Sequence, residues 1–250
     1  MMLKGKVALI TGAGQGVGQG IALAMVAEGA RIAVVGRTLS KLESTCELIR
    51  ERGGDALAVV CDVKSRSSLE ACVKQVVEHF GTIDILVNNA QEVPLGELQY
   101  IGDMDFEAGF QSGPMAVLRL MKLCRPYLKG GGSIINLATT AAKRWDAKGF
   151  GAYSAVKEAI RSLSRAAASE WAMEGIRVNV VLPHALSPGL DMWTKLNPEE
   201  AEAFVASIPM QRIGDCEKDV GRFVANLCTD SCGYITGQSI AVDGGQAYMG

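Results

Sequence analysis

The stretch KVALITGAGQGVG, residues 6–18, decides the fold class of this chain. Residues 6–10 form an apolar run that predicts a buried strand, and a helix is expected from the end of the glycine cluster to about Gly29. A glycine-rich turn between a strand and a helix N-terminus lets backbone N–H groups approach a pyrophosphate. Glycine is needed there because a Cβ would block the approach or forbid a turn with positive φ. The stretch therefore predicts a dinucleotide-binding α/β fold.

The rest of the chain continues the alternation of strands and helices. This pattern predicts a parallel sheet with right-handed crossovers, which is a doubly wound, Rossmann-type single domain spanning residues 1–250. Further strands are expected at residues 31–35, 56–61, 83–87, 133–137, 176–182 and 239–242, and further helices at 40–52, 65–80, 103–127, 151–174 and 217–228.

Two segments depart from this regular pattern. Pro114 lies inside the helix expected at 103–127 and should kink it or shift its start. Residues 184–209 are expected to be irregular, and this segment is long enough to serve as a lid over a substrate cleft.

Composition excludes several classes of function. The chain has 250 residues, 48% of them hydrophobic, and a net charge of -2, so no nucleic-acid or anionic-membrane partner is indicated. No apolar run reaches the length of about 18 residues that spans a bilayer, and the N-terminus lacks the apolar region of a signal peptide. The seven cysteines form no CxxC pair. Cys228 and Cys232 suggest a zinc site, but scattered reduced thiols in a cytoplasmic protein without a metal are favoured.

The segment Tyr153-Ser-Ala-Val-Lys157 carries the candidate chemistry. Residues four apart share one face of a helix, so the phenol and the ammonium group can approach each other. Lowering the pKa of a phenol from about 10 to about 7 requires roughly 4 kcal/mol. A charge about 4 Å away supplies that energy at an effective dielectric constant of about 20. The pair predicts a proton donor and acceptor, although the same spacing occurs on many ordinary amphipathic helices.

The end of the second strand indicates which cofactor is bound. An acidic residue there would bind the 2′-hydroxyl of NAD(H), whereas Arg37 would pair with the 2′-phosphate of NADP(H). NADP(H) is therefore favoured over NAD(H), although Arg37 could simply be solvated and Gln15 adds no second positive charge. Asp62 follows the third strand, where it could accept a hydrogen bond from adenine or serve as a turn or cap residue.

With these pieces in hand, the chain resembles a short-chain dehydrogenase/reductase from Lys4 to nearly its last residue. The matching motifs, in order, are TGAGQGVG at 11–18, Asp62-Val63, Asn88-Asn89-Ala90, YSAVK at 153–157, IRVN at 176–179, YITGQ at 234–238 and VDGG at 242–245. Their order and spacing together are specific. The resemblance implies one doubly wound domain that assembles into a homotetramer or homodimer.

The resemblance also implies roles for individual residues. Tyr153 would be the acid/base and Lys157 would bind the nicotinamide ribose. The serine that holds the substrate oxygen in the family falls on Thr139 by strand register, or on Thr140 by counting back from Tyr153. The cofactor-binding set implied is Gly12, Gln15, Gly16, Val17, Gly18, Arg37, Asp62, Val63, Asn89, Ala90, Lys157 and Pro183.

Three further positions depart from the family pattern. Gly113 stands where the family has an asparagine of a proton-relay chain, so another group or water would have to do that work. Gln91 and His184 each replace a glycine and bring a side chain close to the mouth of the cleft. His184 could orient a substrate or carry a proton, or it could fill space and bond a backbone carbonyl.

The function expected is NADP(H)-dependent interconversion of a ketone and a secondary alcohol. Met192 and Trp193 in the lid, with Trp145, suggest an apolar or aromatic-ring substrate, unless they only pack in the core or at an oligomer contact. One alternative is reduction of a 3-oxoacyl thioester. Another is a weakly catalytic nucleotide-binding sensor or scaffold, which the departures at Gln91, Gly113 and His184 favour and the intact Tyr153/Lys157 pair opposes.

Overall fold

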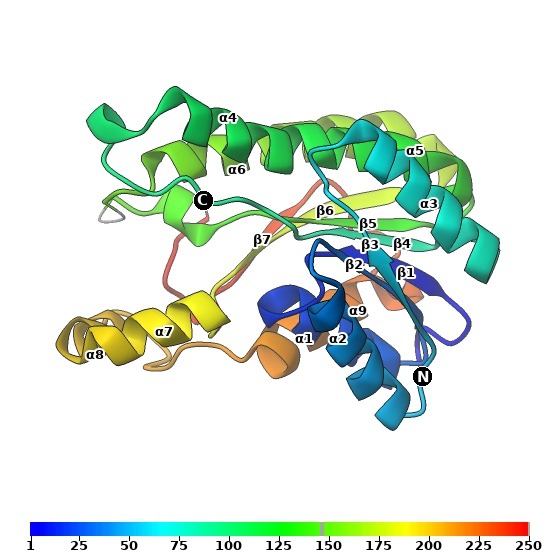
Figure 1. Ribbon diagram of the computed structural model, residues 1–250, viewed down its shortest axis with the longest axis horizontal. Helices are drawn as coiled ribbons and strands as arrows, with labels where there is room; N and C mark the ends of the chain where they lie inside the picture. The colour runs from blue at the N-terminus through cyan, green and yellow to red at the C-terminus, as the bar shows by residue number, and fades with distance from the viewer. Residues whose placement is uncertain (146–147, 250) are drawn as a thin grey trace.

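The computed structural model describes residues 1–145 and 148–249, and in this part of the chain seven strands form one parallel sheet (Figure 1). The strand order is β3-β2-β1-β4-β5-β6-β7. This arrangement confirms the doubly wound parallel sheet expected from the alternating pattern. The strands are β1 (Val7–Thr11), β2 (Arg31–Gly36), β3 (Ala56–Val60), β4 (Ile85–Asn88), β5 (Ser133–Leu137), β6 (Arg177–Pro183) and β7 (Ser239–Val242).

Helices cover both faces of the sheet (Figure 1). One face carries α1 (Gly16–Ala27), α2 (Leu39–Glu51) and α9 (Arg222–Leu227), and the other carries α3 (Arg66–Phe80), α4 (Asp103–Phe110), α5 (Ala116–Leu128) and α6 (Gly151–Trp171). Short helical turns complete the framework: η1 (Leu98–Tyr100), η3 (Thr140–Lys143), η4 (Ala172–Glu174), η5 (Cys216–Gly221) and η6 (Asp230–Cys232).

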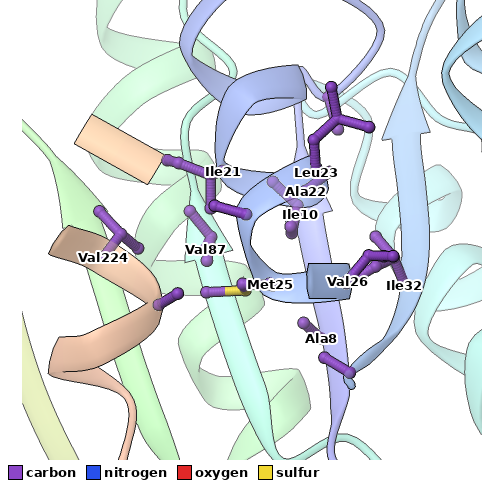
Figure 2. Close-up of a cluster of buried hydrophobic side chains, with 14 of the residues drawn as sticks. Ala8, Ile10, Ile21, Ala22, Leu23, Met25, Val26, Ile32, Val87 and Val224 are labelled. Atoms are coloured by element: carbon purple, nitrogen blue, oxygen red, sulfur yellow. The ribbon is translucent and has the colours of Figure 1, made fainter. Parts of the chain in front are cut away.

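The apolar core follows from the strand sequences, which are buried on both sides. Figure 2 shows Ile10 of β1 and Val87 of β4 beneath Ile21 and Met25 of α1, with Val224 of α9 beside them. A second buried cluster lies on the opposite face, under α3, α5 and α6. This double burial explains why the strands are nearly continuous apolar runs.

The direction in which successive strands are added to the sheet changes at β1. Strand β2 pairs with one edge of β1 and β4 with the other, so the connections run outward in opposite directions from this point. In open parallel sheets a crevice forms at such a switch point, outside the carboxyl ends of the strands. The glycine turn at residues 11–18 lies at that end of β1.

The sequence predicts a kink or a shifted helix start at Pro114, and the structure has a π turn there between two α-helices. The backbone passes from α4 through a π turn, η2 (Gln111–Met115), into α5 with right-handed helical angles at Gln111 and Met115. A π turn widens the hydrogen-bonding pattern locally. It thereby accommodates a residue that has no N–H to donate.

The expectation of an irregular segment at 184–209 is wrong. This segment contains two helices, α7 (Pro188–Leu196) and α8 (Pro198–Ala206), which stand away from the sheet in Figure 1. Each helix begins with a proline, whose fixed φ suits the first helical position. The Ser187 side chain caps α7 by accepting a hydrogen bond from the backbone N–H of Leu190 at 3.4 Å.

Within the described residues, no helix combines the length and the apolar character needed to cross a membrane.

The packing of α1 on η5 yields a test of the fold. A Cβ on Gly20 would lie 2.4 Å from the backbone carbonyl carbon of Cys216, which cannot move without shifting η5. We expect Gly20→Ala to cost about 1–3 kcal/mol and to lower the Tm by several degrees, measured by thermal unfolding. Gly189→Ala is the control, because nothing lies within 4 Å of its Cβ position. Equal Tm values for the two variants would contradict this packing.

Candidate active site

A cleft of about 570 Å³ opens at the carboxyl ends of the strands. It brings together residues from the ends of β1, β2, β4, β5 and β6 and from the start of α6. Of the residues expected from the sequence, the cleft is lined by Gly12, Gln15, Gly16, Val17, Arg37, Asp62, Val63, Asn89, Ala90, Thr139, Tyr153, Lys157 and Pro183.

The glycine turn is held in place from the end of β4. The Thr11 hydroxyl accepts hydrogen bonds from the backbone N–H groups of Asn89 and Ala90, both at 3.0 Å. The Asn89 amide donates to the carbonyl oxygens of Thr11 and Gly12 at 2.9 and 3.2 Å. A Cβ on Gly12 would lie only 2.7 Å from that amide nitrogen. Asn89 therefore shapes the turn as well as lining the cleft.

The turn is suited to an anionic pyrophosphate. Gly12 and Gly16 have positive φ values of 66° and 58°, which a side chain would strain. No side chain caps the N-terminus of α1, so the backbone N–H groups of its first turn face the cleft without a side-chain partner. These features fit the phosphates of a dinucleotide.

Gly18 is an exception among the expected cofactor residues, because it is buried and does not line the cleft. A Cβ at this position would lie 2.5 Å from the Gly12 carbonyl oxygen and 2.6 Å from the Asn89 amide. Glycine is required here for packing of α1 beneath the turn. The role of Gly18 at the pyrophosphate stays a prediction.

A group of charged side chains lies where the adenosine end of a dinucleotide would bind. Arg37 pairs with Glu92 at 2.9 Å, and Lys64 pairs with the same carboxylate at 3.0 Å. Lys41 donates to the Gln15 side-chain oxygen at 2.6 Å. No motif in the sequence pointed to Lys41, Lys64 or Glu92, although Lys41 lies four residues after Arg37, in the first turn of α2.

Asp62 has the turn role considered for it, whereas its hydrogen bond to adenine stays a prediction. One carboxylate oxygen accepts a hydrogen bond from the backbone N–H of Lys64 at 3.0 Å, which stabilises the turn after β3. Ser65, and not Asp62, caps α3. The residue also lines the cleft next to Val63, so its side chain serves the turn and still faces the cleft.

Tyr153 and Lys157 lie together near the start of α6. The Lys157 ammonium group is 3% exposed and donates to the Leu137 carbonyl oxygen at 2.7 Å. It lies 5.6 Å from the centroid of the Tyr153 ring. The helical spacing therefore brings the two groups together, as expected from the sequence.

The pKa of the Tyr153 phenol shifts in the direction opposite to the one expected from the nearby Lys157 charge alone. Burial raises the pKa of Tyr153 above its ordinary value, and burial lowers the pKa of Lys157 to about 7. Desolvation disfavours both charged forms and outweighs the attraction between them. At neutral pH the phenol is therefore protonated and has a proton to donate.

The structure distinguishes between the two threonines. Thr139 lines the cleft, and its hydroxyl oxygen accepts a hydrogen bond from the backbone N–H of Ala141 at 3.2 Å. The hydroxyl proton can then donate to a ligand in the cleft. Thr140 is buried and does not line the cleft, so the strand register identifies the better-placed residue.

His184 packs against α8. The His184 ring contacts the Phe204 ring of α8 edge-on, with 5.2 Å between the centroids. Trp193 of α7 also contacts the Phe204 ring, with 5.7 Å between the centroids. Within the described residues neither ring nitrogen has a hydrogen-bond partner, and burial lowers the pKa of His184. The arrangement supports a packing role, although no carbonyl accepts from its ring.

No group of three or more His, Cys, Asp or Glu side chains in the described residues is arranged to hold a metal ion. Cys228, considered for zinc, is buried, and burial raises the pKa of its thiol to about 12.

Sequence comparison identifies the family. Residues 12–247 match the family model described as Enoyl-(Acyl carrier protein) reductase. The chain is 39% identical to the 12alpha-hydroxysteroid dehydrogenase of Clostridium sp., with 96% of each chain covered. It is 34% identical to the 3-oxoacyl-[acyl-carrier-protein] reductase FabG of Staphylococcus aureus, with 98% of each covered.

Solved structures agree with this result. The short-chain dehydrogenase/reductase from Serratia marcescens superposes with a TM-score of 0.91 at 30% identity and covers 99% of this chain and 100% of its own. A blue fluorescent protein from a metagenomic library, in complex with NADPH, gives a TM-score of 0.91 at 29% identity with the same coverage. The chain belongs to the short-chain dehydrogenase/reductase family and is an NAD(P)-dependent oxidoreductase.

The lowered pKa of Lys157 predicts how NADPH binding depends on pH. A bound anionic dinucleotide favours the charged ammonium, so the pKa of Lys157 in the complex lies above the value of about 7 in the free protein. Above pH 7 binding must then take up a proton, and the Kd should rise by up to about tenfold per pH unit. Fluorescence titrations between about pH 7 and 9 measure this, a range in which the 2′-phosphate is already ionised.

Lys157→Met is the control for this measurement, because its side chain does not titrate. Its NADPH affinity should be weaker and independent of pH over the same range. A Kd of the unaltered protein that stays constant from pH 7 to 9 would contradict the assignment.

Proposed function

We propose that this protein is an NADP(H)-dependent oxidoreductase that interconverts a ketone and a secondary alcohol, with Tyr153 as acid/base. One observation carries the proposal: the glycine turn, Thr139, Tyr153 and Lys157 all line the same cleft. The dinucleotide end of the cleft therefore adjoins a buried proton donor and a second hydroxyl group.

The chain's own residues would handle the substrate oxygen. The bound nicotinamide would supply or accept the hydride at the substrate carbon. In the reduction, the protonated Tyr153 phenol donates its proton to the oxygen as negative charge develops there. Thr139 donates a hydrogen bond to the same oxygen, and the Lys157 ammonium stabilises the phenolate that remains. In the oxidation, the same groups act in reverse.

The preference for NADP(H) is supported by two cations at the adenosine end. Arg37 follows β2, and Lys41 reaches the glycine turn through Gln15. A 2′-phosphate carries enough charge to compete with Glu92 for Arg37. Lys41 supplies the second positive charge that the glycine turn itself lacks.

The substrate we propose is a bulky apolar ketone or alcohol of the hydroxysteroid class. The loop after β4 exposes Val93, Leu95 and Leu98, and it is tied to the start of α6 by a hydrogen bond from the Gly96 N–H to the Gly149 carbonyl at 2.8 Å. Across the cleft, Leu186 and Met192 are exposed on the segment that we propose as a lid. Exposed apolar side chains on both sides of a cleft fit an apolar ring system.

A hydroxysteroid also accords with the 39% identity to a 12alpha-hydroxysteroid dehydrogenase. The 3-oxoacyl thioester alternative is supported by the similarity to FabG, but the charges near the lid do not favour it. A phosphorylated carrier arm would require basic groups at the cleft mouth. Lys195 of α7 is neutralised by Asp191 at 2.7 Å, and Lys143 of η3 lies 3.9 Å from Glu158.

Tyr153→Phe tests the proton donor. It should lower kcat for NADPH-dependent reduction of 12-oxolithocholate, a 12-oxosteroid, by at least about 100-fold, because the phenyl ring has no proton to give. The Kd for NADPH, measured by cofactor fluorescence, should change little. Tyr100→Phe, on an exposed tyrosine, is the matched control and should retain full activity. Comparable turnover by Tyr153→Phe would refute the assignment.

Arg37→Asp tests the cofactor preference. Loss of a charge-assisted hydrogen bond to the 2′-phosphate should weaken NADPH binding by roughly 10- to 100-fold, while NADH binding is unchanged or tighter. Arg222→Asp makes the same change of charge at an exposed position of α9, outside the cleft, and should alter neither affinity. An unchanged NADPH affinity in Arg37→Asp would exclude contact between Arg37 and the phosphate.

A further inference from the structure

The side chain of Gln91 occupies the space beside Gly113. Gly113 is buried in the π turn η2, where a Cβ would lie 2.4 Å from the Gln91 side-chain oxygen and 3.1 Å from its nitrogen. The same Cβ would lie 2.9 Å from Val156 of α6. A glutamine at 91 and any larger side chain at 113 therefore exclude each other in this packing. Two departures from the family pattern, far apart in sequence, form a single contact.

The Gln91 amide nitrogen holds the end of β4 against η2. It donates to the carbonyl oxygens of Glu92 and Gly109 at 2.7 and 2.8 Å and approaches the Ser112 hydroxyl at 3.2 Å. The Ser112 hydroxyl also donates to the Gly109 carbonyl, at 3.3 Å. Gln91 thus adds a side-chain donor that ties the end of β4 to the junction of α4 and η2.

The Gln91 side-chain oxygen is buried and accepts no hydrogen bond from the described residues. A buried amide oxygen without a partner costs about 1–3 kcal/mol. Gln91 lines the cleft together with Lys157, and its oxygen lies next to the α6 turn that carries Val156 and Lys157. The Lys157 ammonium has three N–H donors, of which the Leu137 carbonyl accepts one.

We propose that Gln91 is a positioning residue for Lys157. Its amide takes the place of a side chain at Gly113, fixes η2 against α6, and offers its oxygen to the Lys157 ammonium through one hydrogen-bonded water. The contact holds the ammonium charged and in place beside Tyr153. The role of Gln91 in turnover rests on the proposed function. The steric exclusion between the Gln91 amide and a side chain at residue 113 does not.

A double-mutant cycle tests this proposal with Gln91→Ala, Gly113→Asn and the combined variant. Gln91→Ala should lower kcat for NADPH-dependent reduction of 12-oxolithocholate by roughly tenfold or more, with the KM for NADPH little changed. The alkaline limb of its pH profile should move to lower pH, since Lys157 loses a stabilising acceptor. A purely structural role would not move that limb.

The other two variants separate space filling from simple damage. Gly113→Asn alone should clash with the Gln91 amide and lower both the Tm and the activity. The combined variant should recover kcat to near that of the unaltered protein and have a higher Tm than either single variant. Gln99→Ala, on an exposed glutamine of the same loop, is the control and should behave like the unaltered protein.

The proposal is overturned if Gln91→Ala keeps the unaltered kcat and pH profile, or if the combined variant is no better than its worse parent. Absence of turnover by the unaltered protein would count against the proposed function. In that case the Tm cycle and the pH dependence of NADPH binding in Gln91→Ala decide the inference. Additive Tm changes, together with an unchanged pH dependence, would then reject it.

Discussion

Burial of the Lys157 ammonium is the constraint on which the site depends. A lysine with 3% exposure is stable only where the fold supplies fixed acceptors, and here the carbonyl at the end of β5 is one of them. The same burial lowers the pKa of Lys157 to about 7, so its charge responds to any anion that enters the cleft. The site is therefore electrostatically sensitive to a bound dinucleotide.

The position of that lysine is determined well outside the cleft. A buried chain of hydrogen bonds runs from the Asn88 amide to Asn136 of β5 at 2.7 Å, and from Asn136 to the Ser164 hydroxyl of α6 at 2.8 Å. Such a network orients α6 on the sheet more exactly than apolar contacts can, because hydrogen bonds depend on both distance and angle. The Asn89 amide adjusts the glycine turn from the neighbouring position. The end of β4 thus connects the cofactor side of the cleft with the catalytic side.

Much of the fold could be predicted from the sequence, because apolar runs and glycine turns have short-range physical causes. The helices α7 and α8 were missed even though Pro188, Pro198 and the Ser187 cap are local signals for helix starts. Most of the expected site residues line one cleft, since most belong to motifs at the carboxyl ends of strands. Three features could not be predicted because they depend on tertiary packing. They are the close packing around Gly18, the pairing of Arg37 with Glu92, and the rise in the pKa of Tyr153. The contact between Gln91 and Gly113 also depends on tertiary packing, because the two residues belong to different elements.

The central claim is that a buried ammonium and a protonated phenol face the reactive end of a dinucleotide held by the glycine turn. A crystal structure of the NADPH complex tests it most directly. The account predicts that the pyrophosphate lies on the N-terminus of α1, that the Lys157 Nζ lies about 3 Å from a nicotinamide ribose hydroxyl, and that the Tyr153 hydroxyl points to the nicotinamide ring. A phenol turned away from the ring, or a pyrophosphate bound elsewhere, would contradict it.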